Sequence, residues 1–557
     1  MSRIDEVYAR IAEADRSEVF ITLRPQADVA ADYERSVADG GPLAGVLLAV
    51  KDNVDVHGLP TTAGCPGFAF APESDAPTVA ALRAAGAVVV GKTNLDQFAT
   101  GLVGTRSPYG AVRDSRRPDR ISGGSSSGSA VAVALGFADI AIGTDTAGSG
   151  RVPAALQGIV GIKPTVGVVS TAGVVPACAS YDVVTVFAAD LALADRSMAV
   201  MAEAVGPRPF PESRPCAAQE RPVVAVPTEL PGLDDRWRAA FGEAVHRAEA
   251  AGFTIKTIDL SPFLEAARLL YDDALVAERY DAVGDYLDSV ADPVAAGLDP
   301  TVSAIIGAAN RFSAVDLLRA HRRLADLRAE AMEQWGDASV LMVPTAPTHP
   351  TLAEVAADPV GVNSRMGIYT NFCNLFDLCG LAVPAGTVGE EGSGTAQFGI
   401  TFLGLGHTDA VLVDVARRFL GDDAVAPSWA ERDDAVELAV FGAHMRGGPL
   451  THELSDRGAR WSGEVTTTPS YRLVALDTTP PKPGLIRDPV AARAIRGEVW
   501  TLSPAALGGF LAALPEPMML GKVEIAAGET GPTRWIVGFG CAADAGAAGE
   551  RLDRDRW

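Results

Sequence analysis

Cysteine is scarce in this sequence, and its spacing excludes a disulfide scaffold. Only 6 of the 557 residues are cysteine, they are scattered along the chain, and no C-x-x-C pair occurs. Disulfide-stabilised domains are short and dense in cysteine, so we expect a protein of a reducing compartment, the cytoplasm. An H-E-x-x-H motif and clustered Cys/His ligands are also missing, so we expect no metal and no other cofactor.

Long apolar runs are missing as well. The longest, residues 130–142, contains Asp139 and is shorter than the about 20 residues that a membrane helix needs. The first twenty residues have the charged pattern of an amphipathic helix and lack the apolar core of a signal peptide. We therefore expect no interaction with a membrane.

Positive charge is in deficit. Lys and Arg number 47 against 70 Asp and Glu, which gives a net charge of −23. Such a field repels polyanions, so we expect no nucleic-acid partner. An anionic small substrate would need a local cluster of positive charge.

The chain is long enough for several domains and carries 48% apolar residues, enough for a large core. Residues 40–200 alternate strand patterns (45–50, 87–91) with helix patterns (77–86, 127–137), which predicts an α/β fold with a mixed or mostly parallel sheet. After a Pro-rich connection at 206–222, strand and helix patterns resume. Short strand patterns at close spacing near the C-terminus indicate a smaller β-rich domain. We predict domains at 1–425 and 437–557, joined by a linker at 426–436.

Two segments rich in Gly and Ser, 121–136 and 143–158, precede helix patterns. Pro153 suits the first turn of a helix, so residues 146–149 form a turn at a helix N-terminus. Such a turn presents unpaired backbone N–H groups, which can stabilise an oxyanion next to a serine. The alternative is that both segments are ordinary helix caps or linkers.

A serine nucleophile needs a base, and none of the seven histidines lies in either segment. Lys51 ends an apolar strand pattern, where desolvation lowers the pKa of an amine and favours its neutral, basic form. It could act on Ser149 directly or through Ser125. The alternative is a solvated lysine with no catalytic role.

Three motifs together resemble the amidase signature family: LLAVKDNVDVHG, GGSSSGSA and GTDTAGSGRVPAA. Ser125 follows Lys51 by 74 residues and precedes Ser149 by 24. The resemblance covers about residues 1–420 and implies a mixed central β-sheet covered by helices. It also implies Ser149 as nucleophile, Ser125 with a cis peptide as proton relay, and Lys51 as base.

The resemblance further implies an oxyanion hole at the nucleophile turn. Its donors are the backbone N–H groups of Thr146, Ala147, Gly148 and Ser149. Ala147 stands where many members of the family have glycine, a departure that is harmless if its φ is negative.

Tyr271 and Arg279 lie eight residues apart in LLYDDALVAERYDAV. On one helix, two turns would place them on a similar side, where a guanidinium and a phenol can bind a carboxylate. A solvated arginine and a packed tyrosine are the alternative. The segment resembles that of allophanate hydrolases, which implies a substrate-binding role for both residues and a backbone contact from Gly101.

The tail supports the same resemblance. Residues 441–461 and 469–476 resemble the C-terminal domain of allophanate hydrolases, an α+β domain similar to γ-glutamyl cyclotransferases. His444, in a Gly-flanked turn after a strand pattern, is the candidate group for its chemistry; the alternative is a structural histidine.

The resemblance implies hydrolysis of allophanate to ammonia and carbon dioxide through N-carboxycarbamate. It also implies a homodimer and an upstream partner, a biotin-dependent urea carboxylase. Two alternatives stay open: a broad-specificity amidase or amidotransferase-like protein, and a non-catalytic scaffold.

Overall fold

The computed structural model describes residues 2–390, 394–422, 426–431, 434–490, 493–527 and 532–557. Contacts divide the chain into two compact units, Met1–Pro209 with Val223–Leu412, and Phe210–Pro222 with Val413–Trp557. The division at Leu412 precedes the predicted boundary at 425. Part of the predicted linker, residues 432–433, lies outside the described residues.

The Pro-rich segment 210–222 belongs to the second unit because hydrogen bonds join it to helix α15 (Asp409–Leu420). The backbone N–H of Ala218 donates to Asp414, and the Arg418 guanidinium donates to the carbonyl of Gln219. Pro-rich composition indicated a surface connection, but it could not reveal these long-range partners.

The first unit is built on one mixed sheet with the strand order β1-β3-β2-β4-β6-β5-β10-β11-β9-β7-β8. Strand β2 runs parallel to both β3 and β4, whereas β4 runs antiparallel to β6. This confirms the predicted mixed sheet. The strands are β1 Phe20–Leu23, β2 Leu47–Lys51, β3 Val88–Thr93, β4 Ile140–Asp145, β5 Val160–Lys163, β6 Val183–Ala188, β7 Val223–Pro227, β8 Thr254–Ile258, β9 Val340–Pro344, β10 Leu378–Glu390 and β11 Gly394–Leu405.

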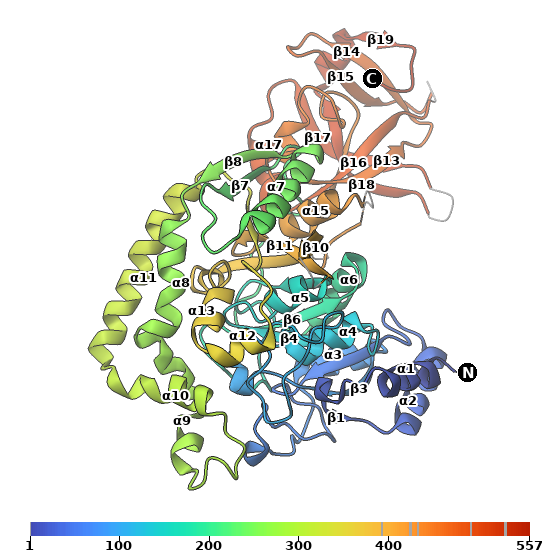
Figure 1. Cartoon of the computed structure of the whole chain (residues 1–557). Helices are drawn as coiled ribbons and strands as arrows, with labels where there is room; N and C mark the ends of the chain where they lie inside the picture. The colour runs from blue at the N-terminus through green and yellow to red at the C-terminus, as the bar shows by residue number, and fades with distance from the viewer. Residues whose placement is uncertain (1, 391–393, 423–425, 432–433, 491–492, 528–531) are drawn as a thin grey trace. The chain divides into compact units, whose positions relative to one another are not determined.

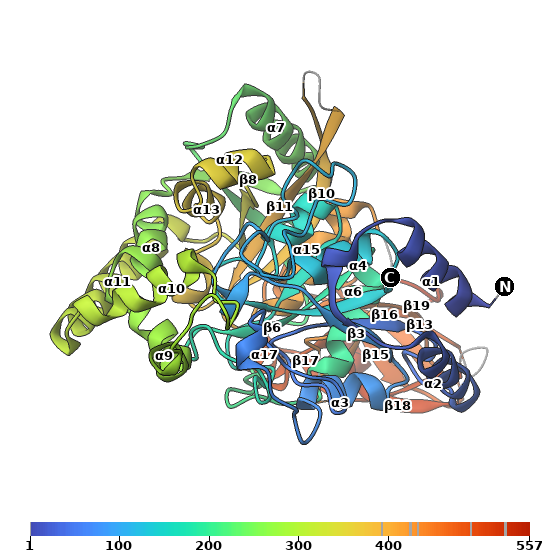
Figure 2. The ribbon, with the colours of Figure 1, turned by 60° about the horizontal axis from the view of Figure 1, so that its bottom comes forward.

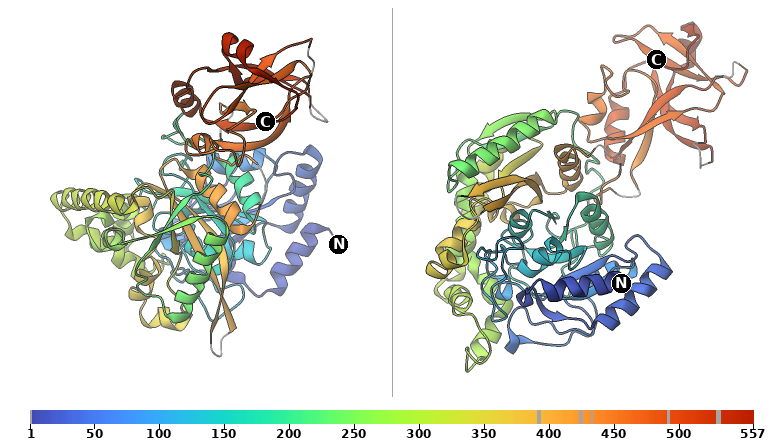
Figure 3. Two further views of the ribbon diagram at one scale, coloured as in Figure 1. Left: turned by 90° about the horizontal axis from the view of Figure 1, so that it is seen from above. Right: turned by 45° about the vertical axis from the view of Figure 1, so that its right-hand side comes forward.

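Helices cover this sheet, as Figures 1 and 2 show. In all views α8 and α11, drawn in yellow-green, lie side by side at one end of the unit (Figures 1 and 3). The helices are α1 Arg3–Glu13, α2 Gln26–Asp39, α3 Pro77–Ala84, α4 Ser127–Ala134, α5 Val152–Gln157, α6 Leu191–Met201, α7 Asp235–Ala250, α8 Ser261–Asp272, α9 Ala277–Ser289, α10 Pro300–Gly307, α11 Ala314–Trp335, α12 Leu352–Ala357, α13 Gly361–Met366 and α14 Phe372–Leu375. Single 3₁₀ turns are η1 Ser17–Val19, η2 Pro66–Phe68, η3 Gln97–Ala99, η4 Ala274–Val276 and η5 Ala308–Arg311. No helix in the described part of the chain has the length and apolar character needed to cross a bilayer.

The strands that position the site are buried along their whole length. Every residue of β2 and of β4 is buried, as expected for strands covered on both faces. Because β2 and β4 are parallel neighbours, their C-terminal ends, Lys51 and Asp145, meet at the same edge of the sheet. Helix α4 is buried from Ser127 to Val133, and its small residues let it pack closely against this sheet.

The second unit contains a sheet of order β13-β16-β12-β18-β17 and a smaller one of order β15-β14-β19. The predicted short strands near the C-terminus are confirmed as β14, β16, β17 and β18. The strands are β12 Val436–Val440, β13 Arg460–Thr466, β14 Tyr471–Leu476, β15 Lys482–Arg487, β16 Arg496–Leu502, β17 Met518–Ile525, β18 Arg534–Cys541 and β19 Glu550–Leu552, with helices α16 His452–Ser455, α17 Pro504–Ala512 and α18 Ala543–Ala548.

Candidate active site

Lys51, Ser125 and Ser149 form a continuous chain of hydrogen bonds. The Lys51 Nζ lies 2.8 Å from the Ser125 Oγ, and the Ser125 hydroxyl donates to the Ser149 Oγ over 2.9 Å. Lys51 ends β2, Ser125 precedes α4, and Ser149 precedes α5. All three are buried, and the Gly124–Ser125 peptide bond is cis. The structure thus brings together the three residues that the motifs singled out.

The environment of Lys51 favours the neutral amine. Complete burial lowers its pKa from 10.5 to about 7, although the carboxylates of Asp96, Asp182 and Asp145 act in the opposite direction. Its Nζ also lies 2.7 Å from the Thr144 Oγ1. At neutral pH a large fraction of the amine is therefore unprotonated, and it can then accept the hydroxyl proton of Ser125.

Two buried carboxylates hold the turn that carries Ser149. The Thr146 hydroxyl donates to Asp182, which also accepts the backbone N–H of Ala177 over 2.7 Å. Asp145 pairs with Arg151 at 2.9 Å, and both side chains are fully buried. These interactions fix the turn against the end of β4.

The predicted oxyanion donors are not equivalent. The N–H of Gly148 donates to Asp145 over 2.9 Å, so in this structure it is not open to a substrate, and its place in the predicted oxyanion hole needs correction. In the described part of the chain, the N–H groups of Thr146, Ala147 and Ser149 have no protein partner. These three are the donors that the turn offers.

Gly148 has a structural role in the same turn. Its φ is +131°, and a Cβ there would lie 2.3 Å from the Thr370 Oγ1, so only glycine fits. Ala147, the departure from the family pattern, is not among the non-glycine residues with positive φ. Alanine therefore adopts the backbone conformation at 147 without strain.

Tyr271 and Arg279 meet, but not on one helix as the spacing predicted. Helix α8 ends at Asp272, Asp273 is extended, and α9 begins at Ala277 after a 3₁₀ turn. The Asp273 side chain caps this turn by accepting the N–H of Ala274, a local competition with the helix that periodicity does not show. The Arg279 Nη2 still donates to the Tyr271 hydroxyl over 3.0 Å.

The Arg279 guanidinium is buried with unused hydrogen-bonding capacity. Arg279 is 1% exposed, and its Nη1 donates to the Thr100 Oγ1 over 3.1 Å. Its Nε has no partner among the described residues. Because a buried cation with a free donor is unfavourable without an anion, this group is suited to bind one. Its charge also acts on Lys51 and lowers that pKa, which places it within electrostatic reach of the base.

Gly101 follows Thr100 and lies against Asp96. A Cβ at 101 would lie 2.6 Å from the Asp96 Oδ2, which also accepts the N–H of Gly104 over 2.9 Å. The close approach explains the glycine in packing terms. A backbone contact from Gly101 to a substrate stays a prediction.

His444 lies in the second unit, in the turn after β12. It is buried, its Nε2 lies 2.8 Å from the Glu453 Oε2, and its ring stacks on Phe539 with centroids 5.0 Å apart. Burial lowers the pKa of His444, whereas Glu453 acts in the opposite direction. Because a carboxylate only accepts, Nε2 carries a proton and Nδ1 remains for other partners.

The sequence reasoning missed the residues that support the Lys51–Ser125–Ser149 chain. Thr144 and Asp145 stand inside the GTDTAGS motif, so that motif could have drawn attention to them. Asp96 lies outside the three motifs, five residues before Gly101. Asp182 lies in no quoted motif, and only the fold shows that it binds Thr146.

Comparisons with family models divide the chain in the same order. A model described as amidase matches residues 4–412, and one described as allophanate hydrolase C-terminal domain matches residues 436–552.

Individual proteins give consistent matches. Urea amidolyase of Lachancea kluyveri is 42% identical over 530 residues, which cover 90% of this chain but 28% of that protein. This chain therefore spans less than a third of the length of that relative. Urea amidolyase of Saccharomyces cerevisiae is likewise 42% identical, over 537 residues that cover 90% of this chain and 28% of the yeast protein. A solved structure of Kluyveromyces lactis allophanate hydrolase has a TM-score of 0.86 and 38% identity, over 99% of this chain and 94% of that one.

Proposed function

Since the chain belongs to the amidase family over residues 4–412 and carries an allophanate hydrolase C-terminal domain over residues 436–552, we propose that it hydrolyses allophanate to ammonia and carbon dioxide. The first unit cleaves the terminal amide and yields N-carboxycarbamate, and the second unit assists its decarboxylation. The observation that carries the proposal is the position of Arg279. Its buried guanidinium can bind an anion and lies within electrostatic reach of the Lys51–Ser125–Ser149 chain.

Acylation begins at Ser149. Its Oγ attacks the terminal amide carbonyl while its proton passes to the Ser125 Oγ, whose own proton passes to the neutral amine of Lys51. The carbonyl oxygen becomes an oxyanion and accepts hydrogen bonds from the free N–H groups of Thr146, Ala147 and Ser149.

The same relay then works in reverse. Lys51, now protonated, returns the proton through Ser125 to the amide nitrogen, the C–N bond breaks, and ammonia leaves. A water molecule, deprotonated by the regenerated amine, attacks the acyl group on Ser149. The ester bond breaks and N-carboxycarbamate is released.

Allophanate carries a negative charge on its carboxylate. The net charge of the chain, −23, repels it, so binding needs a local positive charge. Arg279 and Tyr271 bind this carboxylate, since the guanidinium supplies charge and donors and the phenol lies 3.0 Å from it. Gly101 adds the proposed backbone contact. A neutral amide lacks the group that Arg279 binds, so it is a poorer substrate.

The test compares allophanate with a neutral amide such as propionamide. Arg279→Ala should lower kcat/KM for allophanate about 30-fold or more and leave propionamide hydrolysis within about twofold, as expected when a buried charged partner is removed. Arg268→Ala, an exposed arginine on α8, is the matched control and should change neither. An equal change for both substrates would instead support a broad-specificity amidase or amidotransferase-like protein.

Three finer features belong to the same proposal. A biotin-dependent urea carboxylase supplies allophanate, in line with the match to part of a protein named urea amidolyase. The location is the cytoplasm, which the free state of all six cysteines supports. The chain forms a homodimer, as the family resemblance implies, and light scattering of the purified protein tests this.

A further inference from the structure

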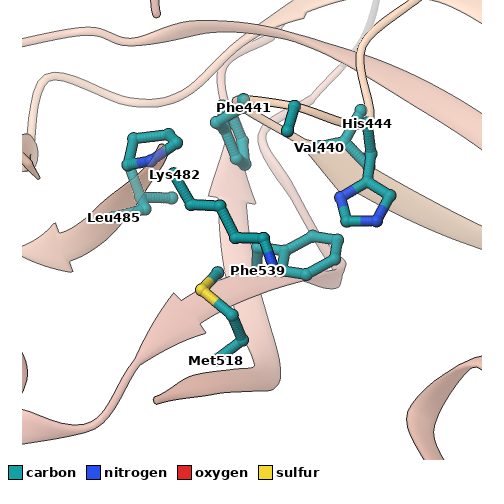
Figure 4. Close-up of a pocket in the computed structure, with 10 residues that line it drawn as sticks. Val440, Phe441, His444, Lys482, Leu485, Met518 and Phe539 are labelled. Carbon is teal, nitrogen blue, oxygen red and sulfur yellow. The ribbon is translucent and has the colours of Figure 1, made fainter. Parts of the chain in front are cut away.

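The second unit contains a small pocket beside His444 (Figure 4). It is partly open to solvent, and about 300 Å³ of empty space lies within it when that open part is counted. Apolar side chains make most of its wall, among them Phe441, Met518 and Phe539. Two groups that can carry positive charge, His444 and Lys482, also line it. A pocket of this composition favours a small anion over a neutral or cationic ligand.

Lys482, the first residue of β15, is the unusual member of this wall. The residue is 6% exposed, and among the described residues its Nζ has no hydrogen-bond or ion-pair partner. Figure 4 shows its side chain extending across the pocket toward Phe539 and His444. The Lys482 ammonium thus lies beside an apolar wall without a counter-charge from the described residues, and a bound anion would supply that charge.

The backbone holds Lys482 close to His444. A Cβ at Gly442 would lie 2.4 Å from the Cδ of Pro483, so only glycine lets the turn after β12 lie against the start of β15. The charge of Lys482 acts on the imidazole of His444, and Glu453 faces that imidazole with the opposite charge. Cation, imidazole and carboxylate therefore form one electrostatic group.

We propose that Lys482 is the carboxylate-binding residue of this pocket, and that the ligand is a small dicarboxylate whose central nitrogen lies beside His444. The inference rests on the proposed function, because N-carboxycarbamate, the product of the first unit, is such a dianion. His444, the other group of the pocket that can carry positive charge, is hydrogen-bonded to Glu453. Among the described residues that line the pocket, Lys482 is therefore the cation left to bind the carboxylate.

The reaction that this arrangement serves is decarboxylation. With one carboxylate held by Lys482, the bond from nitrogen to the other carboxyl carbon breaks and carbon dioxide leaves into the apolar part of the pocket. The electron pair of that bond stays on nitrogen, which takes a proton from the imidazolium form of His444 and becomes the amino group of carbamate. His444 regains its proton from solvent, with Glu453 stabilising its charged form.

The first experiment measures ammonia and carbon dioxide separately during allophanate turnover. Lys482→Met should leave the rate of the first ammonia release unchanged and reduce carbon dioxide release to the uncatalysed rate of the intermediate. Lys522→Met, which removes an exposed lysine on β17, should change neither rate. Carbon dioxide release at the wild-type rate in Lys482→Met overturns the inference, whereas a wild-type protein that releases no ammonia from allophanate overturns the proposed function instead.

The second experiment tests whether Lys482 binds an anion, and it needs no turnover of substrate. Malonate has the shape and charge of N-carboxycarbamate with CH₂ in place of NH, and its binding is measured by calorimetry on full-length Arg279→Ala, which lacks the carboxylate group of the first unit. Adding Lys482→Met should abolish the remaining binding, and adding Lys522→Met should not. Malonate binding that survives Lys482→Met overturns the inference.

Thermal unfolding separates binding from a structural role. Because the pocket wall is apolar, Lys482→Met should keep or raise the midpoint of unfolding, whereas loss of a structural lysine would lower it. Lys482→Arg, which keeps the charge, should restore part of the malonate binding and of carbon dioxide release. Lys482→Gln, which keeps a polar stem without charge, should restore neither; restoration by Gln would contradict a charge-based role.

Discussion

Lys51 and Ser125, 74 residues apart in the sequence, are joined by a 2.8 Å hydrogen bond between two fully buried side chains. Burial has two effects at once. It removes the water that would compete for the serine hydroxyl, and it lowers the pKa of the amine to about 7. The first, second and third predictions below depend on this pair.

The amidase step should depend on pH through Lys51. The neutral amine is the base, so kcat/KM for ammonia release should rise with pH, with a slope of about one, and level off above a pKa of about 7. Initial rates between pH 5 and 9 test this. A flat profile over that range would exclude Lys51 as the base.

Lys51 should also make stability depend on pH, with a definite sign. Its folded-state pKa, about 7, lies below the usual 10.5, so the folded protein binds fewer protons than the unfolded chain between these values and gains stability as pH rises. Below pH 7 the desolvation penalty is complete. Lys51→Met should therefore stabilise the protein more at pH 6 than at pH 9, relative to wild type, as measured by urea unfolding; an equal difference at both pH values would contradict this.

Ser149→Ala should lower ammonia release by about three orders of magnitude or more without changing the midpoint of unfolding, because it removes the nucleophile. Ser125→Ala should also impair it severely, since the amine then has no relay. If the two serines act as one unit, the double variant should be about as slow as Ser149→Ala alone. Multiplicative losses would show that Ser125 acts independently.

The sequence predicted that Lys51, Ser125 and Ser149 lie together, because each of them stands in a motif with a physical reason. Lys51 ends an apolar strand, and the turn before Pro153 opens a helix, so both environments follow from local pattern. Periodicity failed between Tyr271 and Arg279, where the Asp273 side chain ends one helix and caps the next turn. Contacts made across the fold, such as that of Asp182 with Thr146, have no local signature.

The strand order was equally beyond the sequence. Local alternation located β2 and β3, but the pairing of β5 with β10 joins residues near 161 to residues near 381. Such pairing depends on which buried faces fit together after both halves of the chain are present. For the same reason, the sequence could not show that the N–H of Gly148 donates to Asp145 while the N–H groups of Thr146, Ala147 and Ser149 stay free.

Thr144 should tune the base. Its Oγ1 lies 2.7 Å from the Lys51 Nζ and accepts from the charged amine, so Thr144→Val removes a hydrogen bond that stabilises the protonated form. The acid limb of the pH profile should shift to lower pH, and kcat should fall about tenfold because the amine is less well oriented, a loss of about 1.4 kcal/mol. Thr144→Ser keeps the hydroxyl and should restore both. An unchanged limb in Thr144→Val would show that this contact does not bear on the base.

The turn that carries Ser149 should require glycine at 148. A side chain there would collide with Thr370, in addition to straining the backbone. Gly148→Ala places a Cβ 2.3 Å from the Thr370 Oγ1 at a φ of +131°, so the turn that carries the oxyanion donors must move. We expect kcat for ammonia release to fall by about two orders of magnitude, the loss typical when an oxyanion donor is removed, with KM for allophanate little changed because the substitution leaves Arg279 in place. Gly252→Ala is the matched control, since Gly252 also has a positive φ, +87°, but a Cβ there meets nothing within 4 Å. It should lower the free energy of unfolding by about 1 kcal/mol without affecting kcat; an equal loss of activity in both variants would assign the effect to general destabilisation.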